Sequence, residues 1–132
     1  MSKSARWPKF VAVGVILLLL GIFVLNLPRG YSVDLSRIGK GSDVVVLVHD
    51  QGIIASERLM RVVDAVRPDY EGRIEFLVAD LNLLAGREFA EAHGVESVTL
   101  LLFRSDGRRL KTLQGLQDEV TLRDALNRVF GY

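Results

Sequence analysis

The stretch "HDQGIIAS", residues 49–56, gathers side chains that could do covalent chemistry. His49, Asp50 and Ser56 are residue types found in hydrolases, in which a base takes the proton of a serine nucleophile. Such a serine also needs oxyanion donors, and nothing around it resembles a G-x-S-x-G turn. We therefore expect Ser56 to cap the N-terminus of a helix and His49 to be a polar residue at a strand end. Catalysis by Ser56 stays open as the alternative.

The 132 residues include no cysteine. This excludes disulfides, thiolate nucleophiles, zinc–thiolate sites and iron–sulfur ligation within the chain. The only two histidines, His49 and His93, fall on separate predicted elements, and no group of acids has the spacing of metal ligands. His93 precedes Gly94 at a predicted helix C-terminus, where an imidazole suits the helix dipole. We expect neither a metal nor a cofactor.

The charges are unevenly distributed. Residues 1–30 hold four bases and no acids, whereas residues 31–132 hold 13 bases and 16 acids, a net charge of −3. A mildly acidic domain on a basic stem gives no nucleic-acid signature. Bases also cluster around the Asp106-Gly107 turn, where they could contact anionic lipid headgroups or an acidic partner. We favour a solvated hairpin whose charges discourage edge pairing: Arg104, Arg108, Arg109 and Lys111.

Residues 10–27, "FVAVGVILLLLGIFVLNL", form an uncharged apolar run. As a helix the run would reach about 27 Å, against a hydrocarbon core of about 30 Å. It is longer than the apolar core of a signal peptide, and no small-x-small cleavage site follows it. We therefore expect an uncleaved, single-pass transmembrane anchor in the lipid bilayer, with a cleaved signal peptide as the rival. The bases of tail 1–9 narrowly favour a cytoplasmic N-terminus and an outward-facing domain, periplasmic in a bacterium with two membranes.

After a linker, residues 28–42, the pattern of residues 43–132 becomes regular. Val44–Val48 is an uninterrupted apolar run, as in a strand covered on both faces. We expect a helix from Ser56 to about Arg67 and a last helix that begins near Thr121, which with Asp124 resembles a capping box. Between them we expect a second strand, a short helix and a hairpin: "RIEFLVADLN", "LAGREFAEAHG" and "VTLLLFRSDGRRLKTLQG". The order β-α-β-α-β-β-α predicts an α/β domain.

This order and several stretches, such as "FLVADLNLLAGREFAEAHGVESVTLLLFRSDG" and "GLQDEVTLRDALNRVF", resemble the thioredoxin-like superfamily over residues 43–130. The resemblance implies a central mixed sheet flanked by helices. It places Ile53 and Ser56 where active members carry the two cysteines of Cys-x-x-Cys, and a serine hydroxyl cannot form a redox pair. The cis-proline of the family is also absent. Either Val98 takes its place or the loop is one residue shorter, and we expect a trans peptide there.

The domain also looks short at its N-terminal side, because members of the family usually have a strand and a helix before the strand that corresponds to the one at Val44. Only "YSVDLSRIG", residues 31–39, is available for that role. Either it forms a brief edge strand, with the usual first helix missing, or it leaves the sheet edge beside residues 74–78 open to a partner.

Taken together, the sequence indicates a redox-inactive, non-enzymatic domain that binds or scaffolds another membrane-associated protein. Ile53, Ile54 and Val98 would form an apolar patch, with Ser56 beside it, on the face that carries the active site in the family. Two alternatives stay open. The protein could be an accessory component of a thiol–disulfide or envelope redox system whose cysteines lie in a partner, or a non-thiol enzyme that uses Ser56.

Overall fold

The computed structural model describes residues 2–25 and 30–132, which belong to two compact units, Met1–Gly30 and Tyr31–Tyr132. The first unit is the helix α1 (Ser2–Leu25). Within the described residues, no helix is both long and apolar enough to cross a membrane. Residues 26 and 27 of the predicted anchor lie outside the described residues.

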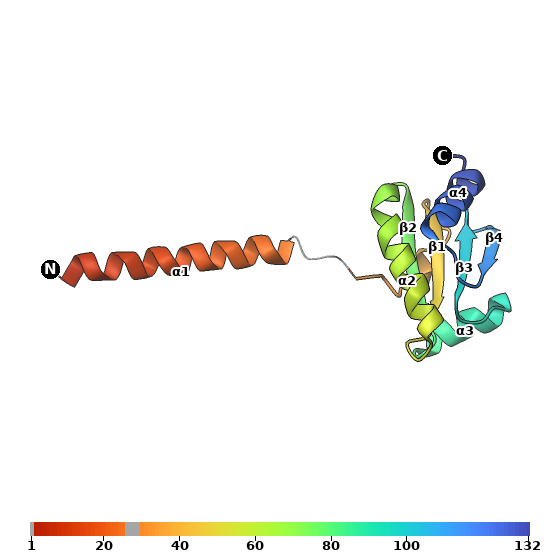
Figure 1. The fold of residues 1–132 in the computed structure, drawn as a ribbon, viewed down its shortest axis with the longest axis horizontal. Coiled ribbons are helices and arrows are strands. Elements are labelled where there is room, and N and C mark those ends of the chain that lie inside the picture. Colours follow the sequence, from red (N-terminus) through yellow and green to blue (C-terminus); the bar gives the residue numbers. More distant parts are fainter. Residues whose placement is uncertain (1, 26–29) are drawn as a thin grey trace. The chain divides into compact units, whose positions relative to one another are not determined.

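The second unit is built on a four-stranded sheet in the order β2-β1-β3-β4 (Figure 1). Strands β1 and β2 run parallel, whereas β3 runs antiparallel to both β1 and β4. The bounds are Asp43–His49 for β1, Ile74–Asp80 for β2, Thr99–Phe103 for β3 and Arg109–Gln114 for β4. This mixed sheet and the helices on its two faces confirm the expected α/β class.

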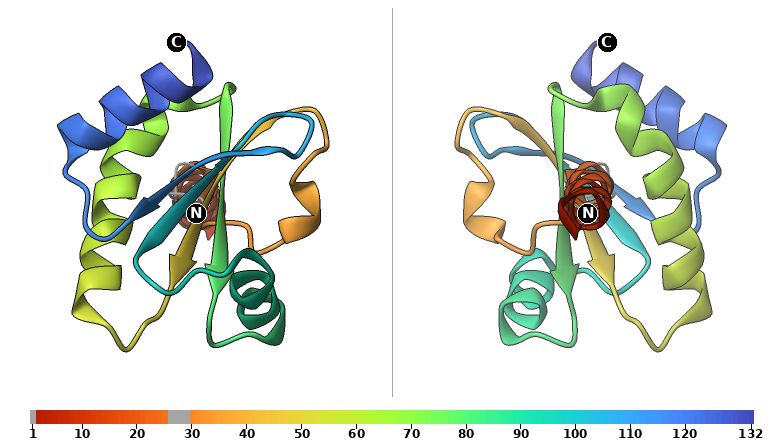
Figure 2. Two further views of the ribbon diagram at one scale, coloured as in Figure 1. Left: turned by 90° about the vertical axis from the view of Figure 1, so that its right-hand side faces the viewer. Right: turned by 90° about the vertical axis from the view of Figure 1, so that its left-hand side faces the viewer.

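Helices cover both faces of the sheet (Figure 2). Helices α2 (Ile54–Val66) and α4 (Glu119–Phe130) cover one face, and α3 (Leu84–His93) covers the other together with the short turn η1 (Leu35–Arg37). A second short turn, η2 (Arg67–Tyr70), follows α2.

Strand β1 contributes to a hydrophobic core on each face. Because successive strand residues point to opposite faces, Val45 and Leu47 join the first core, beneath α2 and α4, while Val44 and Val46 join the second, beneath α3. All four are buried, which explains why the strand reads as a continuous apolar run. Burying one such side chain contributes about 1.5–3 kcal/mol to stability.

Two of the predicted helix caps are wrong. The N-cap of α2 is Ile53, and Ser56 lies inside the first turn of the helix. The N-cap of α4 is Asp118, whose carboxylate accepts a hydrogen bond from the backbone N–H of Thr121 at 2.7 Å. In both cases, the residue predicted to cap the helix lies three positions after the actual cap.

Residues 31–42 belong to the second compact unit, and residues 28 and 29 of the predicted linker lie outside the described residues. Ser32 forms an isolated parallel bridge with Leu77, and its carbonyl accepts the N–H of Val78 at 3.0 Å. The Tyr31 hydroxyl donates to a carboxylate oxygen of Asp64, and burial together with this carboxylate raises the pKa of the hydroxyl. The edge of β2 is thus paired at one bridge, and η1 is the one helical turn described between Gly30 and β1.

Candidate functional site

The carboxyl ends of β1 and β2 lie at the same end of the sheet. Their register pairs His49 with Asp80, the last residue of each strand. From here the chain enters α2 on one face and α3 on the other, so two helix N-termini lie at this end (Figure 2). Ligands of open α/β sheets gather beyond the carboxyl ends of the strands, which makes this end the candidate site.

The residues that suggested a hydrolase do meet here. Nδ1 of His49 lies 2.7 Å from Oγ of Ser56, and Nε2 of the same ring lies 3.5 Å from Oε1 of Glu57. Glu57 was not among the residues predicted from the sequence, although its position next to Ser56 on one helical turn brings it within reach. The carboxylate of Asp50 plays no part in this chain of contacts. Its Oδ1 accepts the N–H of Gly52 at 3.0 Å.

The Ser56 hydroxyl is placed to support the fold. It is fully buried, His49 is 5% exposed, and the backbone N–H of Asp50 donates to Oγ at 3.0 Å. With no exposed surface and two partners already in place, this oxygen has no open path to a substrate. The hydroxyl joins the end of β1 to the first turn of α2.

Four large aliphatic side chains are exposed at the N-termini of α2 and α3, and we call them the apolar end. Ile53 is 38% exposed, Ile54 73%, Leu83 46% and Leu84 63%. Ile53 and Leu83 are the N-cap residues, so neither helix has a side-chain cap hydrogen bond. Ser, Thr, Asp or Asn at an N-cap contributes about 0.5–2 kcal/mol over an apolar residue, and both helices forgo this contribution.

Ile53 and Ile54 were predicted from the sequence to belong to an apolar patch, whereas Leu83 and Leu84 were not. The sequence pattern could have indicated Leu83 and Leu84 as well, because each pair lies where a buried parallel strand ends and a helix begins. Val98, the third residue expected in the apolar patch, is half-buried and packs against the first core.

Val98 has an unusual backbone conformation. Its φ is 58°, in the left-handed region, and the peptide bond that precedes it is trans. Two backbone hydrogen bonds hold it: its N–H donates to the carbonyl of Val48 at 3.0 Å, and its carbonyl accepts the N–H of Gly115 at 2.8 Å. A β-branched residue is rarely found in this region, and such strain costs about 1–3 kcal/mol.

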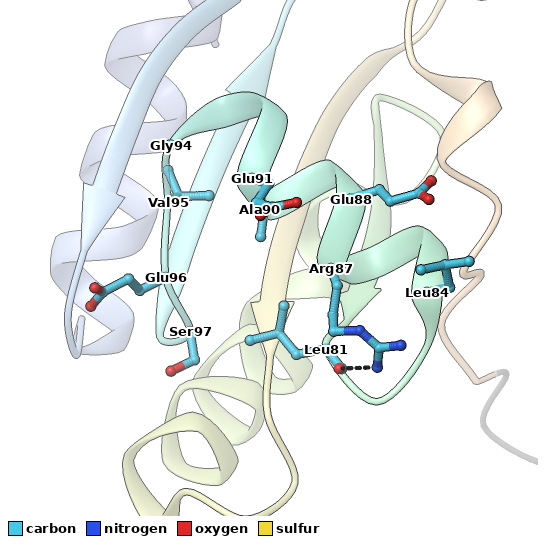
Figure 3. A pocket seen from close by; sticks show the side chains of 10 residues that line it. All are labelled: Leu81, Leu84, Arg87, Glu88, Ala90, Glu91, Gly94, Val95, Glu96 and Ser97. Atoms are coloured by element: carbon cyan, nitrogen blue, oxygen red, sulfur yellow. Dashed lines mark hydrogen bonds between the residues drawn. The ribbon is translucent and has the colours of Figure 1, made fainter.

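An open groove of about 860 Å³ lies between α3 and residues 94–97 (Figure 3). Arg87 lies along one wall, where its Nη1 donates to the carbonyl of Leu81 at 3.2 Å. Leu84 belongs both to this groove and to the apolar end. The groove therefore continues the apolar end along the α3 face of the domain.

Within residues 8–24 and 30–132, no group of three or more histidine or acidic side chains is placed to hold a metal ion. His93 instead packs against two aromatic rings, with its ring centroid 4.3 Å from that of Phe89 in a tilted arrangement and 5.5 Å from that of Phe103 edge to face. Burial, aided by the nearby Arg109, lowers the pKa of its imidazole.

The features at this end of the sheet are thus a buried His49–Ser56 pair, an exposed apolar end and an adjoining groove. No protein-family model matches this chain. The function proposed below therefore rests on these features, above all on the apolar end.

Proposed function

We propose that residues 31–132 form a non-catalytic module that docks a protein partner on the apolar end. The observation that carries the proposal is the exposure of Ile53, Ile54, Leu83 and Leu84 at two helix N-termini that lie at the same end of the sheet (Figure 2). Large aliphatic groups exposed together at one end of a domain commonly mark an interaction site. A partner that covers them recovers about 25 cal/mol for each Å² of apolar surface removed from water.

A non-catalytic role is supported by the state of the one candidate nucleophile. The hydroxyl of Ser56 is buried and hydrogen-bonded to the imidazole of His49 and the backbone of Asp50. These contacts give the serine a structural role, and no catalytic role is needed to explain its presence.

The thioredoxin-like fold is part of this proposal. Its support is the order of strands and helices, in which a parallel pair, β1 and β2, is followed by the antiparallel hairpin of β3 and β4. In that fold, Ile53 and Ser56 stand at the two cysteine positions, so the domain itself exchanges no electrons. A partner with its own cysteines would make the protein an accessory of a thiol–disulfide system, and identification of the partner distinguishes this role from scaffolding.

We further propose that residues 10–27 attach the domain to a lipid bilayer, with the N-terminus cytoplasmic and the domain facing outward. The support is the surface of α1, where the described side chains from Phe10 to Val24 are all uncharged and exposed. Aliphatic groups on every side of a helix favour a hydrocarbon surrounding over water. The partner would then be another membrane-associated protein.

The test is site-specific photo-crosslinking in native membranes. A photoreactive residue replaces Ile54 in one variant and Glu71 in the control, because Glu71 is exposed near the opposite end of β2. We expect a discrete protein adduct from position 54 and none from position 71. The Ile54→Asp/Leu84→Asp double variant should lose co-purification of that same protein while it keeps its circular dichroism spectrum. Equal adducts from positions 54 and 71, or retained co-purification, would reject docking on the apolar end.

A further inference from the structure

We propose that the groove between α3 and residues 94–97 receives a cationic, leucine-bearing segment of the partner protein. This inference rests on the proposed function and specifies the chemistry of the partner beside the apolar end. Three properties of the groove carry it: an apolar floor, carboxylates on both walls, and continuity with the docking surface.

The floor is apolar, and it comes from three parts of the chain. Leu81 follows β2, Leu84 and Ala90 belong to α3, and Val95 lies in the segment before β3 (Figure 3). Leu81, Ala90 and Val95 also pack in the second core, so the floor is held in place by the body of the domain. A leucine side chain from a partner would find aliphatic contacts here without a rearrangement of the backbone.

The walls carry an excess of negative charge. Glu88 and Glu91 lie on the α3 side and Glu96 on the opposite side, and all three are exposed. None of them takes part in an ion pair within residues 30–132. Arg87 is the one base that lines the groove, and it donates to the carbonyl of Leu81. Three carboxylates against one guanidinium leave an excess of two negative charges.

The charges on the walls therefore determine which kind of partner segment binds in the groove. An acidic segment would be repelled by both walls, and a purely aliphatic one would leave three carboxylates without counter-charges. A segment in which lysine or arginine flanks leucine places its bases against the walls and its leucine on the floor. Because Leu84 is shared with the apolar end, a partner segment in the groove also contacts the apolar end.

The test uses the full chain in a neutral maltoside detergent and two fluorescein-labelled probe peptides. One peptide has the sequence Lys-Leu-Lys-Leu-Lys, and the other has glutamate at each lysine position. Fluorescence anisotropy should show binding of the lysine peptide at least about tenfold tighter than that of the glutamate peptide. The Kd of the lysine peptide should rise as salt is raised from about 0.1 M to about 1 M, since the Debye length falls from about 10 Å to about 3 Å.

Glu91→Gln/Glu96→Gln removes one carboxylate from each wall, and it should weaken binding of the lysine peptide about three- to thirtyfold. The matched control, Glu71→Gln/Asp124→Asn, removes the same charge from exposed sites that do not line the groove, and should change the Kd less than twofold. Leu84→Gln tests the floor without a change of charge and should also weaken binding.

Equal affinity of the two peptides, or equal losses in the groove and control variants, would overturn the inference. The experiments distinguish a failure of the groove proposal from a failure of docking on the apolar end. A partner that crosslinks at position 54 while the lysine peptide does not bind would refute the groove and leave the docking surface standing. A lysine peptide that binds through Glu91 and Glu96, without any crosslink at position 54, supports the groove.

Discussion

The structure assigns Ser56 a measurable structural role, and Ser56→Ala tests it. Without Oγ, the N–H of Asp50 and Nδ1 of His49 lose the oxygen that lies 3.0 Å and 2.7 Å away. His49 is buried and Asp50 half-buried. A buried polar group without a partner costs about 1–3 kcal/mol. We therefore expect the variant to lose about 2–4 kcal/mol of its free energy of unfolding.

The assay has to report on residues 31–132 and not on α1. The single tryptophan, Trp7, belongs to the other compact unit, so a probe within the sheet is needed. Amide hydrogen exchange of β1 provides one, because exchange of its central amides requires opening of the domain. A loss of about 2–4 kcal/mol corresponds to exchange of these amides about 30- to 700-fold faster than in the unaltered chain.

The control is Ser42→Ala, because Ser42 is exposed. This variant should exchange within about twofold of the unaltered chain, since substitutions at the surface usually change stability by less than about 0.5 kcal/mol. The reasoning fails if Ser56→Ala leaves the protection of β1 unchanged. A cellular phenotype from Ser56→Ala with unchanged protection would instead favour a serine nucleophile.

Three further substitutions probe the scaffold. In Gly86→Ala the new Cβ would lie 2.0 Å from the carbonyl oxygen of Asp80, so we expect a loss of about 3 kcal/mol or more in urea unfolding. Val98→Gly should be about 1 kcal/mol more stable than Val98→Ala in the same assay, the reverse of the usual order, because φ at this position is 58°. The hydrogen bond from the Thr121 N–H lowers the pKa of the Asp118 carboxyl. The cap of α4 therefore stabilises the fold above pH about 4, and this stabilisation is lost as the pH falls through the lowered pKa of Asp118. Asp118→Asn keeps a cap that does not titrate, and circular dichroism should show a smaller loss of α4 stability between pH 5 and 2 than in the unaltered chain.

The strands and their order along the chain could be predicted because the sequence patterns that indicate them are local. The apolar run of β1 requires a buried strand, and the Asp106-Gly107 turn requires a reversal of the chain between β3 and β4. The role of Ser56 could not be predicted, since its partner His49 lies seven residues away and meets it only once β1 and α2 are in place.

The sequence left open, for a related reason, whether residues 31–39 pair with the edge of β2 or leave it free. One bridge at Ser32 and a few side chains hold this segment, and so short a pairing leaves no strand pattern in the sequence. Leu83 and Leu84 were missed because exposed leucines at a helix start look like core residues in a periodic pattern. Only the structure distinguishes a leucine that faces water from one that faces the sheet.

The bridge between Ser32 and Leu77 is one of the few contacts that hold residues 31–42, and it bears on how the domain should respond to mechanical force. A pull on the chain at residue 30 loads the hydrogen bond between Tyr31 and Asp64 and then this bridge, whereas β1 is hydrogen-bonded to strands on both sides. Residues 31–42 should therefore peel away before the sheet yields. Fully extended, these twelve residues would reach at most about 40 Å, so under tension the segment should lengthen before the sheet itself is loaded.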